Sequence, residues 1–418
     1  MKTGLRSRAV ASACALCTAG VLALAPPAAA VDPAPVRPSA PGQRKATVPP
    51  PDLLQKGGTQ VRLRAGAPAL PDVSALSWLV ADADTGEVLA AHDAHRRLPP
   101  ASTLKTLFAL TVLPAFPAGV RHTVSAKELA GIGEGSSLVG VVEGHTYRVA
   151  DLWHGVFLNS GNDAVHVLAA LNGGWEHTAR QMERKARSLG ALDTTVVSPD
   201  GYDAEGQVSS AYDLAVFGRA GLRDPDFTRY CSTAYASFPG HDGTTYRIAN
   251  TNRLLTGADG VEPYPGLLGI KNGYTSKAGN TLIAAARRGG RTLVVTVMNP
   301  QKGNGLTVYE EARELLDWGF DAAGHVDPVG SLDALRPVSH AGAEAVGSAG
   351  SRAASPAGSD WRGPSTVASA LGVSAGTLLL GLVGVTARRY VRSRRDGDGT
   401  RRTDGPGPRT HGTHRPGG

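Results

Sequence analysis

The sequence predicts a mixed α/β (α+β) fold in which one antiparallel sheet is flanked by helices. Strand signals occur at both ends of a body of about 250 residues, and helical patterns fill its middle. We therefore expect a single sheet whose edge strands come from opposite ends of this body. Hydrophobic residues make up 41% of the 418-residue chain, which is enough to bury a sizeable core.

The first elements of this body are two strands and a helix. Residues 78–81 and 88–90 are apolar and flank a turn at 84–86, so they predict a strand, turn and strand. The pattern over residues 101–113 then becomes helical, and it opens at Ser102 after two prolines, as a helix start should. We expect a helix there.

The remaining elements are helices followed by a hairpin and a final helix. Helical patterns cover residues 149–171 and 175–189. Residues 281–288 and 291–297 are joined by two glycines and predict a hairpin. Residues 309–318 predict a closing amphipathic helix.

Residues 1–30 have the three-part pattern of a secretory signal peptide. Three basic residues precede an apolar stretch that runs to about residue 25, and three alanines follow at 28–30. A buried N-terminal helix is the alternative interpretation of the apolar stretch. Cleavage of the signal peptide leaves Cys231 as the one remaining cysteine, so we expect no internal disulfide in the exported protein.

Two segments of simple composition enclose the predicted domain, which we place at residues 73–325. Residues 31–72 are rich in Pro and Ala without a sustained apolar period, so we expect an extended linker. Residues 326–365 turn to Gly, Ala and Ser, so we expect a flexible stalk.

An uncharged run at residues 366–387 is long enough to cross a bilayer, which takes about 20 residues. The arginine-rich segment 388–418 follows at once, as is typical of a cytoplasmic flank. We therefore expect a single-pass protein of the cell membrane, with its domain on the extracytoplasmic side and its C-terminal tail in the cytoplasm. A buried core helix is the alternative interpretation of residues 366–387.

The net charge of +7 comes from the two ends of the chain. Nine Arg against three Asp give residues 388–418 a charge of +6, and the three basic residues at the N-terminus add +3. The rest of the chain then carries −2. The net positive charge therefore reflects membrane topology, and we expect no nucleic-acid partner.

Ser102 and Lys105 are the first pair of residues that could carry chemistry. They are three apart on a predicted helix, so both lie on one face. A serine hydroxyl is a weak nucleophile that needs an adjacent base, and a buried lysine can be that base when it is neutral. The alternative is that Ser102 merely caps the helix and Lys105 is a solvated charge.

Two further short motifs also have ordinary alternatives. Ser160-Gly161-Asn162 follows an apolar segment and has the composition of a common loop. Lys271-Asn272-Gly273 contains Asn-Gly, which is typical of a hairpin turn. Each motif alone is a weak signal, and their order along the chain is a stronger one.

Ser-x-x-Lys, Ser-x-Asn and Lys-x-Gly, in this order, form the motif set of serine penicillin-binding proteins and serine β-lactamases. The chain resembles the low-molecular-weight D-alanyl-D-alanine carboxypeptidases over roughly residues 75–322. The resemblance rests on PASTLK at 100–105, LNSGNDAV at 158–165, SPDGYD at 198–203, SAYDLA at 210–215, NTNRLL at 250–255 and KNGYTSKAGNTL at 271–282. It implies a β-lactamase/transpeptidase-like fold, with a helical subdomain that carries the Ser-x-Asn motif.

The resemblance implies removal of the terminal D-Ala from peptidoglycan stem peptides through an acyl-enzyme. Ser102 would be the nucleophile and Lys105 its general base. Ser160 would relay a proton toward the leaving D-Ala, and Asn162 would bind a substrate amide. β-Lactam antibiotics would acylate the same Ser102.

The third motif would bind the substrate. Lys271 would attract the terminal carboxylate and, as a nearby cation, help to keep Lys105 neutral. The backbone N–H groups of Ser102 and Tyr274 would form the oxyanion hole. The substrate-binding residues implied by the resemblance are Lys271, Asn272, Gly273, Tyr274 and Thr275.

The resemblance also changes the interpretation of Asn272-Gly273. The better turn is at 276–280, which places Lys271 and Tyr274 in a strand that leads to the strand at Thr281. Gly273 within a strand then indicates a close approach of the substrate to the backbone.

Two positions depart from the family pattern. Asn272 stands where the family usually has a threonine whose hydroxyl helps to hold the substrate carboxylate. The loss of one hydrogen bond to a charged group is worth about 1.5–3 kcal/mol, enough to slow the enzyme without abolishing its chemistry. Trp153-His154 replaces aliphatic residues, and we expect His154 to serve packing rather than catalysis.

Other functions of the same motif set stay open. A D,D-endopeptidase or a transpeptidase would use the same nucleophile, and a low-activity peptidoglycan-binding homologue is favoured by Asn272 alone. A class A β-lactamase ranks low, because no Glu-x-x-Leu-Asn sequence occurs between Asn162 and Lys271.

We expect neither a cofactor nor a metal site. The 12 His residues show no His-Glu-x-x-His spacing, and no Gly-rich phosphate loop follows a strand. The low-complexity residues before the apolar run also predict that a second, all-β domain, which family members often carry, is absent here.

Overall fold

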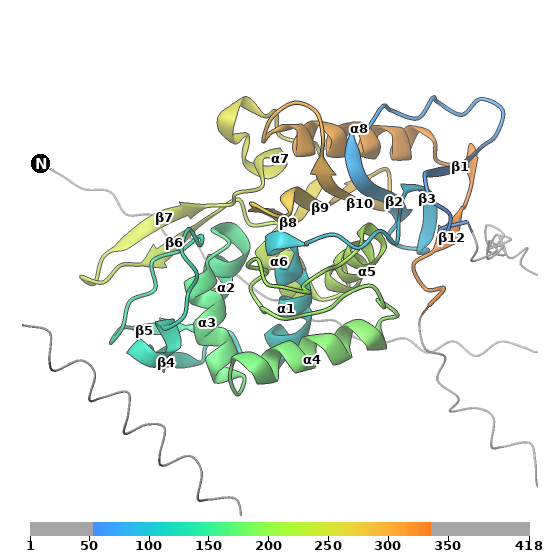
Figure 1. The fold of residues 1–418 in the computed structure, drawn as a ribbon. Coiled ribbons are helices and arrows are strands. Elements are labelled where there is room, and N and C mark those ends of the chain that lie inside the picture. Colours follow the sequence, from blue (N-terminus) through green and yellow to red (C-terminus); the bar gives the residue numbers. More distant parts are fainter. Residues whose placement is uncertain (1–52, 336–418) are drawn as a thin grey trace, which may run out of the picture. The chain divides into compact units, whose positions relative to one another are not determined.

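The structure is a computed structural model that describes residues 53–335 (Figure 1). No helix in this part of the chain is long and apolar enough to cross a membrane. Several predicted segments lie wholly or mostly outside the described residues: the signal peptide (1–30), the linker (31–72), the stalk (326–365), the transmembrane segment (366–387) and the tail (388–418).

The centre of the domain is an eight-stranded antiparallel sheet, as the sequence predicts. Its strands follow the order β11-β1-β3-β2-β10-β9-β8, and β12 pairs with β3. The strands are β1 (Thr59–Leu63), β2 (Ala75–Asp82), β3 (Glu87–His92), β8 (Leu267–Thr275), β9 (Gly279–Arg288), β10 (Arg291–Pro300), β11 (Val326–Asp327) and β12 (Gly330–Ser331).

Strand β2 shows why its sequence is apolar almost throughout. Leu79 and Ala81 belong to the hydrophobic core on one face of the sheet, and Trp78 and Val80 belong to the core on the other face. Successive side chains of a strand point to opposite faces, so a strand covered on both faces needs apolar residues at every position. The same alternation continues in β9, where Leu282 and Ile283 lie in different cores.

Helices cover both faces of the sheet (Figure 1). The predicted closing helix is α8 (Thr307–Asp321), which packs on β9 and β10, and α5 (Ala211–Leu222) packs on β2 and β10 from the other face. The other helices are α1 (Lys105–Val112), α2 (Val149–Leu158), α3 (Asn162–Leu171), α4 (Trp175–Ser188), α6 (Pro225–Cys231) and α7 (Arg253–Thr256).

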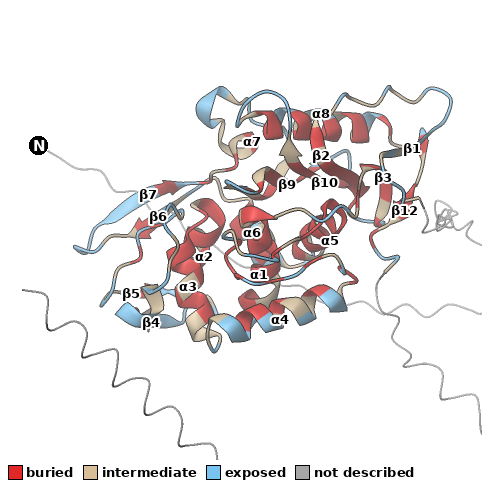
Figure 2. Cartoon of the chain, viewed as in Figure 1, coloured by how far each residue is buried: buried red, intermediate tan, exposed pale blue. Residues whose placement is uncertain are grey.

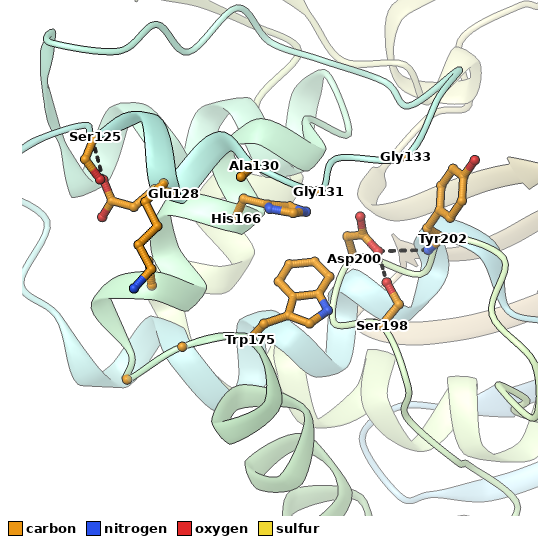
Figure 3. A pocket seen from close by; sticks show the side chains of 14 residues that line it. Ser125, Glu128, Ala130, Gly131, Gly133, His166, Trp175, Ser198, Asp200 and Tyr202 are labelled. Atoms are coloured by element: carbon orange, nitrogen blue, oxygen red, sulfur yellow. Dashed lines mark hydrogen bonds between the residues drawn. The ribbon is translucent and has the colours of Figure 1, made fainter. Parts of the chain in front are cut away.

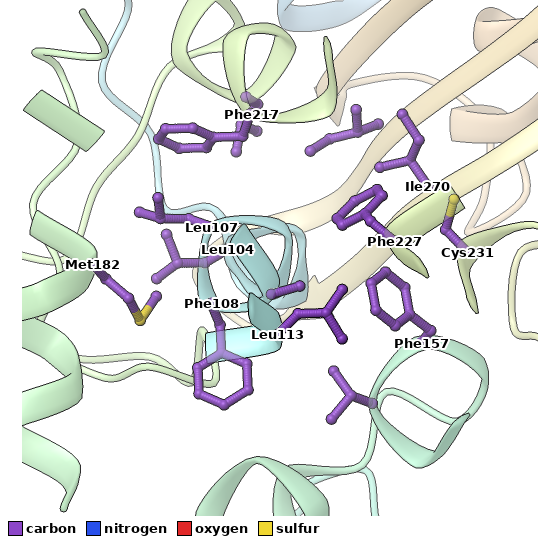
Figure 4. Close-up of a cluster of buried hydrophobic side chains, with 14 of the residues drawn as sticks. Leu104, Leu107, Phe108, Leu113, Phe157, Met182, Phe217, Phe227, Cys231 and Ile270 are labelled. Carbon is purple, nitrogen blue, oxygen red and sulfur yellow. The ribbon is translucent and has the colours of Figure 1, made fainter. Parts of the chain in front are cut away.

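Helix α1 runs through the middle of the larger core (Figure 4). Leu104, Leu107 and Phe108 at its start are fully buried, and Phe157 and Ile270 surround it from other elements. A helix that is buried on nearly every side is typical of a protein core. Helix α1 can therefore hold catalytic side chains at its start in a fixed position.

The Ser-x-Asn motif lies in a helical subdomain between α2 and α3 (Figure 1). One helical segment at 149–171 is predicted, and the chain instead breaks at Asn159–Gly161. Ser160 has a φ of 56°, a left-handed conformation that does not continue a helix. Two short ribbons complete this region, β4 (Arg121–Thr123) with β5 (Thr146–Arg148) and β6 (Tyr235–Pro239) with β7 (Thr245–Ala249), and Figure 2 shows much of the second ribbon as exposed.

The predicted domain boundaries at 73 and 325 are too narrow. Strand β1 lies within the predicted linker, and β11 and β12 lie within the predicted stalk. Val61 pairs with Ala90 of β3, and Leu63 pairs with Val326. These strands have two to five residues with few apolar ones, so no hydrophobic period marks them in the sequence.

The prediction about the edge strands is also wrong. Strands from the two ends of the domain meet inside the sheet, where β2 pairs with β10 over Ala75–Asp82. The free edges are β11 and β8, and both come from the second half of the chain. By contrast, the predicted hairpin of β9 and β10 and the turn between β8 and β9 are confirmed.

Candidate active site

Ser102 and Lys105 lie side by side at the start of helix α1. A short 3₁₀ helix, Ala101–Leu104, leads directly into α1, so the two side chains share one face as predicted. Lys105 Nζ donates a hydrogen bond to Ser102 Oγ at 2.8 Å. Ser102 does not cap the helix, because the residue that precedes the helix is Pro100. Lys105 is not a solvated charge, because it is only 1% exposed. Both alternative interpretations of this pair are therefore wrong.

Two further acceptors fix the Lys105 amine. Its Nζ donates to Asn162 Oδ1 at 2.7 Å and to the backbone carbonyl of Asp200 at 2.6 Å. The first contact joins the Ser-x-x-Lys motif to the Ser-x-Asn motif. The second contact, to the Asp200 carbonyl, was not predicted, because nothing in the sequence 198–203 indicates that a backbone oxygen would bind Lys105.

Burial lowers the pKa of Lys105 from 10.5 to about 8. The nearby carboxylates of Asp200 and Asp163 oppose this shift, because negative charge favours the protonated amine. A base with a pKa near the working pH is both available as the neutral form and able to take a proton. Lys105 is therefore suited to deprotonate Ser102.

Two glycines allow the chain to close around Ser102. A Cβ atom on Gly201 would lie 2.0 Å from the carbonyl oxygen of Ala101, and one on Gly273 would lie 2.6 Å from the backbone nitrogen of Ser102. Ala101 itself has a φ of 50°, a conformation that is unfavourable for alanine. The absence of a side chain at Gly273 makes room for the backbone of Ser102, and the predicted close approach of the substrate at Gly273 stays a prediction.

The Ser-x-Asn turn is held by the loop at 136–137. The Asn162 backbone N–H donates to the Ser137 carbonyl at 2.8 Å, and Asn162 Nδ2 donates to Ser136 Oγ at 3.0 Å. Ser160 is 6% exposed, and its Oγ has no hydrogen-bond partner within residues 53–335. The predicted proton relay through Ser160 stays a prediction.

Asp163 is a residue of the site that the sequence analysis missed. Its buried carboxylate accepts hydrogen bonds from four backbone N–H groups, three of them consecutive, at distances of 2.8–3.0 Å. The donors belong to residues 139, 140, 141 and 164. Asp163 thus fastens the loop that positions Asn162, and its place directly after Asn162 in the motif was the available signal.

Lys271 of strand β8 is a second buried lysine, also 1% exposed. Its Nζ donates to the backbone carbonyl of Asn272 at 2.8 Å. Its pKa is lowered well below the usual value by burial and, second, by the nearby Lys105. We predicted that Lys271 helps to keep Lys105 neutral, but burial is the main cause of the lowered pKa at Lys105.

The next residues of β8 alternate between two sides of the strand. Asn272 lines a separate cavity of about 630 Å³, where its Oδ1 accepts a hydrogen bond from Thr251 Oγ1 at 3.0 Å. Tyr274 is 67% exposed and lines this cavity as well. Thr275 Oγ1 donates to Asp203 Oδ1 at 2.7 Å.

A small cavity of about 190 Å³ lies over the nucleophile. Its walls include Ser102 of the first motif, Asn162 of the second, and Tyr274 and Thr275, which directly follow the third. Asn272 and Gly273 do not line it. The two buried lysines and Ser160 are not among the residues that line it. Of these three, Lys105 contacts the cavity wall directly, through its hydrogen bonds to Ser102 and Asn162.

His154 packs as expected and does not line this cavity. Its ring meets the ring of Tyr230 edge-on, with centroids 5.1 Å apart. Burial lowers its pKa.

The comparisons with known proteins agree with this geometry. The profile of the peptidase S11 family, described as D-alanyl-D-alanine carboxypeptidase, matches residues 64–302. The chain belongs to this family. It is 40% identical over 271 residues to the D-alanyl-D-alanine carboxypeptidase DacB2 of Mycobacterium tuberculosis, which covers 64% of this chain and 89% of that protein.

Other relatives of this D-alanyl-D-alanine carboxypeptidase family member match over the same region. The D-alanyl-D-alanine carboxypeptidase DacD of Escherichia coli is 35% identical over 266 residues, which is 60% of this chain and 65% of that protein. A crystal structure of a D-alanyl-D-alanine carboxypeptidase from Mycobacterium tuberculosis aligns with a TM-score of 0.59 at 37% identity, over 64% of this chain and 99% of that one. The Streptomyces K15 DD-transpeptidase, at 24% identity and a TM-score of 0.56, shares the fold.

Proposed function

We propose that this protein is a serine-type D-alanyl-D-alanine carboxypeptidase that removes the terminal D-Ala from peptidoglycan stem peptides during cell-wall biosynthesis and remodelling. One observation carries the proposal. A lysine with a pKa of about 8 donates a 2.8 Å hydrogen bond to the hydroxyl of Ser102. This pair supplies both the nucleophile and the base that a serine acyl transfer needs.

Acylation begins from the neutral form of Lys105. Its amine takes the hydroxyl proton while Ser102 Oγ attacks the carbonyl carbon of the penultimate D-Ala. Collapse of the tetrahedral intermediate breaks the C–N bond, and the departing amine of the terminal D-Ala takes a proton through Ser160. The buried Ser160 Oγ, which has no hydrogen-bond partner among the described residues, is free to accept and donate in this step.

The developing oxyanion needs N–H donors. The backbone N–H groups of Ser102 and Tyr274 take this role in the proposal, and one such donor is worth about 10²–10³ in rate. The contact between Gly273 and the Ser102 backbone supports it, because it holds strand β8 against the nucleophile.

Deacylation uses water. A water molecule attacks the ester carbonyl, Lys105 takes one of its protons, and the C–O bond to Ser102 breaks. Ser102 regains its proton, and the shortened stem peptide leaves with a new carboxylate. The net reaction is hydrolysis, and a β-lactam forms the same ester on Ser102.

The substrate carboxylate is bound by Lys271 and Asn272 in this proposal. Asn272 lines the neighbouring cavity, its Oδ1 accepts from Thr251, and its amide N–H groups have no partner in the described part of the chain. An amide N–H can donate to a carboxylate. This arrangement favours an active enzyme over a homologue that only binds peptidoglycan.

The protein is proposed to work at the cell membrane. Residues 1–30 would direct export, residues 366–387 would anchor the chain, and residues 388–418 would stay in the cytoplasm. The support is the sequence pattern of these segments.

The test is release of D-alanine from a stem-peptide mimic by three proteins: the wild type, Ser102→Ala and Asn272→Thr. We expect no release from Ser102→Ala, and a several-fold higher kcat/KM for Asn272→Thr because a hydroxyl returns to the carboxylate site. A fluorescent penicillin should label the wild type and not Ser102→Ala. Thermal unfolding of all three proteins controls for folding.

Unchanged release of D-alanine by Ser102→Ala would refute the assignment. Lower release by Asn272→Thr would instead show that the Asn272 amide binds the carboxylate better than a threonine hydroxyl.

A further inference from the structure

A cavity lined by aromatic and polar side chains (Figure 3) shares Tyr202 with the small cavity over Ser102. Its volume is about 840 Å³, within the usual range of ligand sites, against about 190 Å³ for the cavity over Ser102. Its walls come from the 3₁₀ helix Ala126–Leu129, helix α3, the start of α4 and the segment 198–202. No part of the catalytic proposal uses this space.

The large and the small cavity share part of their walls. Gly133 lines the large cavity, and the next residue, Glu134, lines the small one. Likewise, Asp200 lines the large cavity, Gly201 lines the small one, and Tyr202 lines both. The Tyr202 hydroxyl donates to the Glu134 carbonyl at 2.9 Å, so the two walls are tied together.

Aromatic rings supply the apolar part of the large cavity. The rings of His166 and Trp175 lie close together, with centroids 4.1 Å apart, and Tyr202 lies across the cavity from them (Figure 3). Burial lowers the pKa of His166, so its ring is neutral at pH 7. Trp175 is partly exposed, and its indole N–H has no hydrogen-bond partner in the described residues.

Polar groups of both charges complete the lining. Asp200 uses one carboxylate oxygen to accept from Ser198 and from the Tyr202 backbone, and its second oxygen is left for a ligand (Figure 3). Glu128 is already engaged by Ser125 and His122. Lys127 adds a positive charge. Because the lining combines charges of both signs with aromatic faces, the cavity is not specific for a cation or for an anion.

The direction of the substrate leads into this cavity, an argument that rests on the proposed function. If the terminal carboxylate lies at Lys271, the rest of the stem peptide extends along β8 toward Thr275. Thr275 and Ser276 line the small cavity together with Tyr202, which also lines the large one. The end of the stem that is attached to the glycan therefore points toward His166 and Trp175.

We propose that the large cavity is a subsite for a saccharide unit of the glycan strand that carries the stem peptide. A pyranose ring has an apolar C–H face that packs on an aromatic ring, and its hydroxyl and acetamido groups both donate and accept hydrogen bonds. Trp175 supplies the ring and a donor, and Asp200 supplies an acceptor. The enzyme would then recognise its substrate by the sugar as well as by the D-Ala-D-Ala end.

The test compares two substrates, a free stem peptide and the same peptide attached to N-acetylmuramic acid. We expect the wild type to show about a tenfold higher kcat/KM for the sugar-linked peptide, the size expected for one aromatic contact with a hydrogen bond. Trp175→Leu should abolish this preference and leave kcat/KM for the free peptide unchanged. Trp175→Phe, which keeps a ring, should retain most of it.

A second variant guards against misfolding of Trp175→Leu. Gly131 lines the cavity with a φ of 81°, and a Cβ there would meet no atom within 4 Å. Gly131→Asn places a side chain in the cavity with a residue that tolerates positive φ, and should reduce the preference for the sugar-linked peptide. Gly144→Asn is the matched control, because Gly144 has a φ of 77°, equally open surroundings and no part in the cavity.

The outcomes separate this inference from the proposed function. Equal kcat/KM values for the two substrates in the wild type, or a sugar preference that survives both Trp175→Leu and Gly131→Asn, would overturn the saccharide subsite. Absence of D-alanine release from either substrate would instead overturn the carboxypeptidase assignment.

Discussion

Two buried lysines meet in the active site from different layers of the fold, and their surroundings differ. Lys105 and Lys271 are both 1% exposed. Lys105, at the start of a helix, donates to three acceptors and lies near the carboxylates of Asp163 and Asp200. Lys271, on a strand, donates to one backbone carbonyl, and the charged neighbour that shifts its pKa is another cation.

The difference teaches how one residue type can serve two functions at equal burial. Burial lowers the pKa of Lys105 to about 8 although nearby carboxylates oppose the shift, so this lysine can change between its charged and neutral forms as the reaction proceeds. Among the described residues no carboxylate shifts the pKa of Lys271, and the terminal carboxylate of the substrate would supply the missing negative charge. One lysine is thus suited to proton transfer and the other to binding.

The largest expected effect is the loss of proton transfer at Lys105. We predict that Lys105→Arg lowers the rate of Ser102 acylation by a fluorescent penicillin by about 10³-fold or more, because an arginine cannot be deprotonated near neutral pH. Stopped-flow or gel measurement of labelling checks this. Substantial labelling of Lys105→Arg would mean that charge alone, and not a base, is needed there.

We expect a smaller loss of activity from substitution of Lys271, because its role in the proposal is to supply positive charge. We predict that Lys271→Gln lowers kcat/KM for D-alanine release about 10–100-fold, the value of one hydrogen bond between charged groups, and that Lys271→Arg retains more activity than Lys271→Gln. A substrate with a C-terminal amide provides the control. The loss should be much smaller on that substrate, and an equal loss on both would contradict carboxylate binding by Lys271.

The smallest effect concerns the carboxylates near Lys105. Because the neutral amine is the active base, kcat/KM for a free stem peptide should rise with pH through about 8. Asp200 raises the pKa of Lys105, so Asp200→Asn should move this rise to lower pH. The backbone contact from Lys105 to residue 200 is kept in this variant. A shift to higher pH would contradict the assigned direction.

Features that depend on the local periodicity of the sequence could be predicted from the sequence. Ser102 and Lys105 lie on one face because they are three apart on a helix, and the break between β8 and β9 follows from the turn residues at 276–278. The continuous apolar run of β2 likewise predicts a buried strand.

Features that depend on distant segments could not be predicted. The carbonyl of Asp200 is an acceptor for Lys105 through a backbone atom that every residue has. The large cavity is formed by segments near residues 131, 166 and 200, which no periodicity relates. The short strands β1 and β11 depend on pairing with each other and with β3, and their few residues carry too little hydrophobic pattern.

The strand order has a mechanical consequence. The described chain enters the sheet at β1 and leaves it near β11 and β12, at the edge opposite β8. Six interstrand spacings of about 4.8 Å separate the two edges by roughly 29 Å. A force that pulls on the two ends of the described segment would first load the short pairings of β1 and β12 with β3, and then the β1–β11 pair. Strand β8 and its lysine lie at the far side, shielded from tension on either end of the domain.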